Sequence, residues 1–120
     1  MTSEQKIEIA VKALADKKAA EIICTEVGEI TVLADYFLMA TATSSTHVKA
    51  LAEEVEYKLE QAGEKNIKVE GRATDWILID LGDVIVHVFG RQSREFYALD
   101  KMWSDGKQVD INKYLNEGEN

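Results

Sequence analysis

The sequence contains no proline and a single cysteine in 120 residues. One thiol, Cys24, cannot form an internal disulfide or a thiolate metal cluster, and this favours a reducing compartment such as the cytoplasm. No apolar run approaches the roughly 18 residues that span a bilayer, and the first residues are polar. We therefore expect a cytoplasmic protein that neither enters a membrane nor is exported.

Basic residues are also scarce, because 14 lysines and arginines stand against 22 aspartates and glutamates, giving a net charge of -8. Such a chain repels phosphate groups, so direct nucleic-acid binding, sequence-specific or not, is not expected. A basic protein is the expected macromolecular partner. The hydrophobic content of 46% is enough for a core, and the length fits one domain, since domains cluster around roughly 100 to 150 residues.

The apolar pattern predicts one α/β domain over residues 1–106. Strand patterns cover residues 21–27, 31–41 and 67–69, and residues 74–90 are typical of a β-hairpin. The expected fold is a mixed five-stranded sheet packed with about three helices, the second of which crosses between parallel strands. Residues 107–120 form a polar tail, predicted either as a short helix after Asp110 or as a mobile segment.

The ends of the first two helices are marked in the sequence. Thr2 and Gln5 match a capping box, in which each residue satisfies a backbone N–H of the other. The second helix is predicted to begin after Ser44 or Ser45 and to end before Gly63, where a left-handed residue is favoured. The apolar stripe of this helix makes it the clearest element of the chain.

A third helix is expected after the hairpin, with Ser93 as its N-cap. Phe96, Leu99 and Trp103 then share one helical face. Asp105 and Gly106 are expected to end this helix.

The hairpin has two faces of different chemistry. A two-residue turn at Gly82 and Asp83 places only aliphatic residues on one face, in the pairs Leu81 with Val84, Ile79 with Val86 and Ile77 with Val88. The other face carries aromatic, apolar and polar residues, here called the mixed patch: Trp76, Leu78, Asp80, Ile85, His87 and Phe89. The aliphatic face suits a helix-covered core, and the mixed patch is predicted to bind a partner protein.

The mixed patch as a whole, and Trp76 and Asp80 within it, also have ordinary structural interpretations. The whole patch could be a second buried sheet face, with Trp76 as a core residue rather than an interface anchor. Asp80 could accept a bidentate hydrogen bond from an arginine, or bind backbone amides near the Gly82 turn. His87 is assigned to partner contact, because no cysteine is near it in the sequence and, with only one other histidine, a metal site would need carboxylates to complete it.

No metal site is expected from the remaining polar residues. Asp75, Asp80 and Asp83 are close in sequence, but adjacent strand positions alternate sides and the turn should point Asp83 outward. His47 lies in the first turn of the second helix, where we interpret it as a local cap or surface residue. Hydroxyls from Thr41 to Thr46 could bind an anion at the helix N-terminus, although capping accounts for most of them.

Several separated motifs resemble one protein family. They are Ala34-Asp35-Tyr36-Phe37, residues 40–48, residues 71–76, residues 80–89 and residues 94–103. In this order they are similar to the Iojap-like ribosomal silencing factor family. The resemblance implies a translation repressor without cofactor that binds ribosomal protein fourteen of the large ribosomal subunit. Binding there would block joining of the small subunit and lower translation initiation when nutrients are short, and a role in subunit assembly stays open.

The resemblance also implies a nucleotidyltransferase-like topology, which raises an enzymatic alternative. Such enzymes need a Gly-Ser turn and paired carboxylates, whereas residues 41–45 lack glycine and no Asp-x-Asp pair follows the helix. We therefore expect no catalysis. A nucleotidyl- or phosphoryl-transfer enzyme that uses the Thr41–Thr46 loop is the alternative, and a homodimer of the free protein through the apolar face is also left open.

Overall fold

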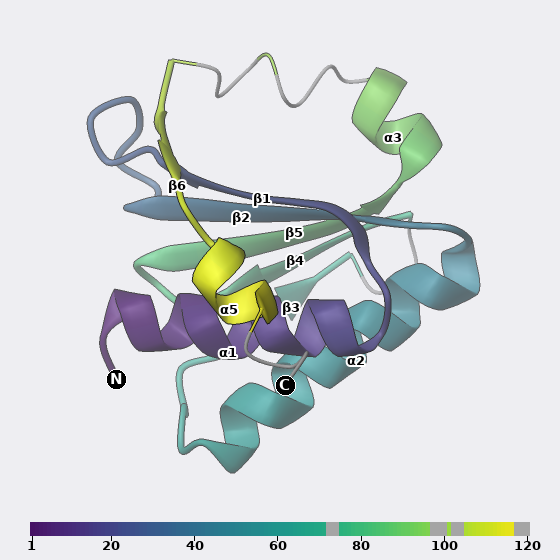
Figure 1. The fold of residues 1–120 in the computed structure, drawn as a ribbon, viewed down its shortest axis with the longest axis horizontal. Helices are drawn as coiled ribbons and strands as arrows, with labels where there is room; N and C mark the ends of the chain where they lie inside the picture. The colour runs from purple at the N-terminus through teal and green to yellow at the C-terminus, as the bar shows by residue number, and fades with distance from the viewer. Residues whose placement is uncertain (72–74, 97–100, 102–104, 117–120) are drawn as a thin grey trace.

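The computed structural model describes residues 1–71, 75–96, 101 and 105–116. Figure 1 shows one sheet with helices on both sides. Helices α1 (Ser3–Asp16), α2 (Ser45–Gln61) and α5 (Asn112–Asn116) lie on one side, and α3 (Arg91–Phe96) lies on the other. The α/β class expected from the sequence is confirmed.

The sheet has six strands in the order β3-β4-β5-β2-β1-β6. The strands are β1 (Ala20–Glu26), β2 (Tyr36–Ala42), β3 (Lys68–Glu70), β4 (Trp76–Asp80), β5 (Val84–Gly90) and β6 (Lys107–Val109). Strands β2 and β5 are parallel and every other neighbouring pair is antiparallel. The mixed sheet is thus confirmed, and α2 connects β2 to β3, which run in the same direction. The nucleotidyltransferase-like topology stays a prediction.

The expected count of five strands is wrong, because residues that the sequence left in a polar tail form β6. Val109 pairs with Cys24 of β1, and the chain then enters α5. Ile111 and Tyr114 are 6% and 8% exposed and belong to the main core. These two apolar residues hold the segment against α1 and the sheet, which a short polar stretch of sequence does not reveal.

The predicted start of α1 and both predicted ends of α2 are confirmed. Thr2 and Gln5 form the capping box, and the Ser44 hydroxyl accepts a hydrogen bond from the N–H of His47. Gly63 follows α2 with a φ of +100°. The predicted start of the third helix is wrong, since α3 begins directly after β5 and contains Ser93. Leu99 and Trp103, which were expected to extend it, lie outside the described residues.

The predicted register of the hairpin is confirmed at the five pairs from Trp76 with Phe89 to Asp80 with Ile85, and Leu81 and Val84 are joined by a backbone hydrogen bond. Gly82 has a φ of +90°, and the N–H of Leu81 donates to the carbonyl of Val84 at 2.9 Å. All six residues of the aliphatic face are at most 2% exposed and pack in the main core with α1 and α2. Cys24 lies in the same core, where burial raises the pKa of its thiol to about 12.

Candidate protein-binding surface

The mixed patch lies on the side of the sheet opposite α1 and α2. Cross-strand pairs bring its members together as predicted: Trp76 with Phe89, Leu78 with His87 and Asp80 with Ile85. The structure leaves four of them half-buried, namely Trp76, Leu78, Asp80 and Ile85. The other two are buried, since His87 is 9% exposed and Phe89 is 0% exposed. The patch therefore has a partly open surface above a buried base.

Arg94 of α3 covers one end of this base. Its guanidinium carbon lies 5.3 Å from the centroid of the Phe89 ring. One guanidinium nitrogen donates hydrogen bonds to the Glu21 carbonyl at 2.9 Å and to the Thr41 hydroxyl at 2.6 Å. Arg94 is only 4% exposed. Sequence reasoning did not single it out for this role, because arginine is rarely fully buried and periodicity cannot show which charge is.

His87 fixes the orientation of Trp76. The indole N–H of Trp76 donates to His87 Nδ1 at 3.3 Å, and Phe37 meets the imidazole edge-on with ring centroids 4.7 Å apart. Since Nδ1 accepts this bond, the neutral ring carries its proton on Nε2. Nε2 is buried and has no partner among the described residues. Burial lowers the pKa of His87 to about 4, so the ring is neutral at pH 7.

The aspartates near the hairpin have separate partners. The Asp80 carboxylate accepts from the Gly82 N–H at 2.8 Å, which is the local role that the sequence left open beside partner binding. Asp75 accepts from the Ser93 hydroxyl at 2.9 Å. Asp83 does not point outward as predicted, because it binds Lys6 of α1 at 2.7 Å. Within the described part of the chain, no three metal-ligating side chains come together.

The hydroxyl-rich segment at the start of α2 borders a cavity of about 450 Å³. Much of its polar lining is already bonded within the protein, since Thr41 accepts from Arg94 and Ser44 caps α2. Arg91, at the rim, forms an ion pair of 2.6 Å with Glu21. The capping role predicted for these hydroxyls is thus confirmed for Ser44.

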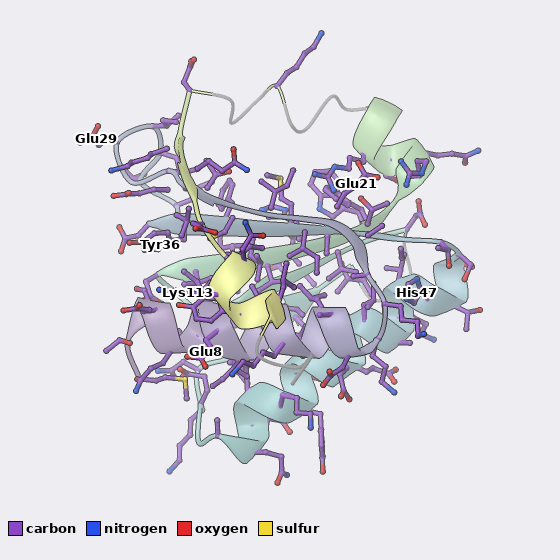
Figure 2. The ribbon with its side chains drawn as sticks, in the orientation of Figure 1. Glu8, Glu21, Glu29, Tyr36, His47 and Lys113 are labelled. Atoms are coloured by element: carbon purple, nitrogen blue, oxygen red, sulfur yellow. The ribbon has the colours of Figure 1, made fainter. Side chains whose placement is uncertain are left out.

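His47, labelled in Figure 2, links the starting turn of α2 to the end of α1. Its Nδ1 accepts from the N–H of Thr43 at 2.9 Å, and its Nε2 donates to the carbonyl of Lys17 at 2.7 Å. Both ring nitrogens are therefore used in local structure. This confirms the interpretation of His47 as a local cap.

A side chain at Gly90, in the same cavity, would force the carboxylate of Asp75 to move. A Cβ atom there would lie 2.4 Å and 2.6 Å from the two carboxylate oxygens of Asp75. Gly90→Ala should therefore lower the free energy of unfolding by about 1–3 kcal/mol, the usual cost of overpacking. Urea denaturation measures this loss. In the Asp75→Ala background the same substitution should cost much less, and an undiminished cost there would contradict the clash with Asp75.

Comparisons with known proteins agree with the motifs. The family described as "Ribosomal silencing factor during starvation" matches residues 1–120. The ribosomal silencing factor of Bacillus subtilis is 36% identical over 98% of this chain and 100% of its own length. A mouse protein named "Mitochondrial assembly of ribosomal large subunit protein 1" is 30% identical over 82% of this chain and 45% of its own length.

A crystal structure from Chromobacterium violaceum has the same fold, with a TM-score of 0.82 and 35% identity over 92% of this chain and 91% of that one. No helix among the described residues has the length and apolar character needed to cross a membrane. The chain therefore belongs to the Iojap-like ribosomal silencing factor family, whose members are ribosome-associated translation regulators and not enzymes.

Proposed function

We propose that this protein is a cytoplasmic translation repressor that binds the large ribosomal subunit through ribosomal protein fourteen and sterically blocks joining of the small subunit. Family membership supports action at the ribosome. The name of the mouse relative, which contains "ribosomal large subunit", supports the choice of subunit. The effect expected in the cell is lower translation initiation when nutrients are limiting.

The observation that carries the proposal is the half-buried Trp76 on a sheet face where the described residues place only the six-residue helix α3. Tryptophan is over-represented among residues that dominate interface energy. The bond to His87 holds the indole in one orientation before binding, which lowers the entropy lost on association. Leu78, two positions along β4, supplies apolar area beside it, and Ile85 extends this area toward the hairpin turn. The rings of buried Phe89 and His87 on β5 contact the indole.

Charge supports a basic partner. The chain carries a net charge of -8, and on β3, beside the patch, Glu70 faces Leu78 while Lys68 faces Asp80. Opposite charges speed the encounter, whereas the apolar anchor slows dissociation. Raising the salt concentration should therefore weaken binding chiefly through a slower association rate.

Co-sedimentation with separated large and small ribosomal subunits tests the proposal, followed by a subunit-joining assay. We expect binding to the large subunit only, and fewer joined ribosomes as the protein is added. Purified ribosomal protein fourteen should compete for the binding. Binding to neither subunit, or binding to the large subunit without impaired joining, would contradict the proposed mechanism.

A further inference from the structure

The loop between β1 and β2 exposes three apolar side chains to solvent. Ile30 is 42% exposed, Leu33 is 66% exposed and Val32 is 102% exposed, so Val32 has no cover at all. We call these three residues the loop tip. In Figure 1 the loop is the slate-blue curl that projects beyond the end of β1 and β2. Large apolar side chains gathered at one exposed place are typical of protein-binding sites.

The loop is built to hold this tip in place. Backbone hydrogen bonds of 2.8–2.9 Å join Val27 to Asp35, and Ile30 and Thr31 to Val27. The Thr31 hydroxyl accepts from the N–H of Leu33 at 3.1 Å. Val27 and Ala34 are buried at the base of the loop. A loop closed in this way presents its apolar side chains without a large ordering cost on binding.

The loop is continuous with the mixed patch. Val27, Ala34 and Phe37 form one small buried cluster, and half-buried Ile85 of the mixed patch packs against it. The N–H groups of Asp35 and Tyr36 both donate to the carbonyl of Asp83 in the hairpin turn, at 2.8 Å and 3.0 Å. The loop tip and the mixed patch are therefore connected parts of one side of the molecule.

The surroundings of the tip are acidic. Glu26 and Asp35 are exposed at the two ends of the loop. Glu29 is exposed within it, and Figure 2 shows Glu29 at its outer edge. A hollow of about 280 Å³ at the base of the loop is lined by Glu26, Glu29 and Asp105, and Lys107 is the cation among its described lining residues. A partner surface that receives the apolar tip must therefore carry lysine or arginine around it.

We propose that the loop tip is a second anchor of the ribosome-binding surface. It inserts into an apolar depression on a basic protein surface, whose lysine or arginine side chains meet the acidic residues beside the loop. The inference rests on the proposed binding to the large subunit and extends it, because it assigns contact to residues outside the mixed patch. The binding surface would then have two anchor sites, with Trp76 at one and Val32 and Leu33 at the other.

Affinity of single variants for the large subunit tests the inference. Leu33→Ser should weaken binding about tenfold, which corresponds to about 1.4 kcal/mol, because the substitution removes an apolar side chain that the partner would bury. Val32→Ser should act in the same direction. Tyr57→Ser is the matched control, because Tyr57 is a 53% exposed apolar residue on α2, across the sheet from the patch. All three variants should keep the melting temperature of the parent.

Two variants that each remove one negative charge complete the test. Glu29→Gln should slow association and reduce its dependence on salt, whereas substitution of the exposed Glu53 on α2, Glu53→Gln, should change neither to the same degree. If the parent binds the large subunit and Leu33→Ser binds equally well, the loop inference is wrong and the proposed function stands. If the parent binds neither subunit, both are wrong. A self-association of the parent that Leu33→Ser abolishes, without effect on subunit binding, would identify a second copy as the occupant and also overturn the inference.

Discussion

Replacing Trp76 by alanine should weaken binding to the large ribosomal subunit roughly 30-fold, which corresponds to about 2 kcal/mol. The substitution removes the largest half-buried side chain of the mixed patch, and with it the apolar area that a partner would cover. It also leaves His87 Nδ1 without the indole N–H that it accepts. Surface plasmon resonance with immobilised subunits measures the change, and most of it should appear in the dissociation rate.

Two variants separate anchoring from folding in this experiment. Trp76→Phe keeps an aromatic ring but loses the N–H, so its affinity should fall between those of Trp76→Ala and the parent. Tyr57→Ala removes an exposed aromatic ring from α2 and should bind as the parent does. Circular dichroism should show folded protein in each case. Parent-like affinity of a folded Trp76→Ala would remove Trp76 from the proposed interface.

Lowering the pH from 7 to 5 should reduce the free energy of unfolding by about 2 kcal/mol through His87 alone. Burial lowers the pKa of His87 from 6.5 to about 4 in the folded protein. The unfolded chain therefore binds a proton that the folded chain does not, at every pH between these two values. Stability from this group is complete above pH 6.5 and is lost as the pH falls toward 4.

Urea denaturation at half-unit steps of pH measures this loss, with His87→Gln as the control. Glutamine can accept the indole hydrogen bond but does not titrate, so its stability should change little between pH 7 and 5. Equal pH dependence in parent and variant would contradict the assignment to His87.

The two acidic residues with lowered pKa values change the free energy of unfolding only at lower pH. Burial raises the pKa of Asp83, but hydrogen bonds from Lys6 and Ser3 outweigh this and hold the pKa below its ordinary value of 3.8. The backbone N–H of Asn66 likewise lowers the pKa of Glu64 below 4.5. Stability from these two groups is present above those values and is lost below them. The interval from pH 6.5 to 5 therefore isolates His87 from both of them.

Features that depend on neighbours in sequence were predictable. The capping box of Thr2 and Gln5, the cap at Ser44 and the left-handed Gly63 each involve contacts within a few residues. The hairpin register follows from a two-residue turn and a side-chain period of two. The sequence alone therefore predicts which residues make up the mixed patch.

Features that depend on distant residues were not predictable in the same way. Strand β6 pairs with the edge strand β1, and the residues that follow it, Ile111 and Tyr114, pack in the main core. The start of α3 at Arg91 depends on β5 passing directly into a helix, which a capping pattern at Ser93 did not indicate. Asp83 turns toward α1 because Lys6, far away in sequence, lies there.

The sequence by itself determined the family, the α/β class, the start of α1, both ends of α2 and the two faces of the hairpin, since local hydrogen bonding and side-chain periodicity encode them. Only the tertiary structure decided which of the patch residues are exposed. Burial depends on what packs over a face, and Arg94 over Phe89 is a contact that no pattern in the sequence shows. The exposed loop tip was decided in the same way, because an apolar run is core or surface according to whether another element covers it.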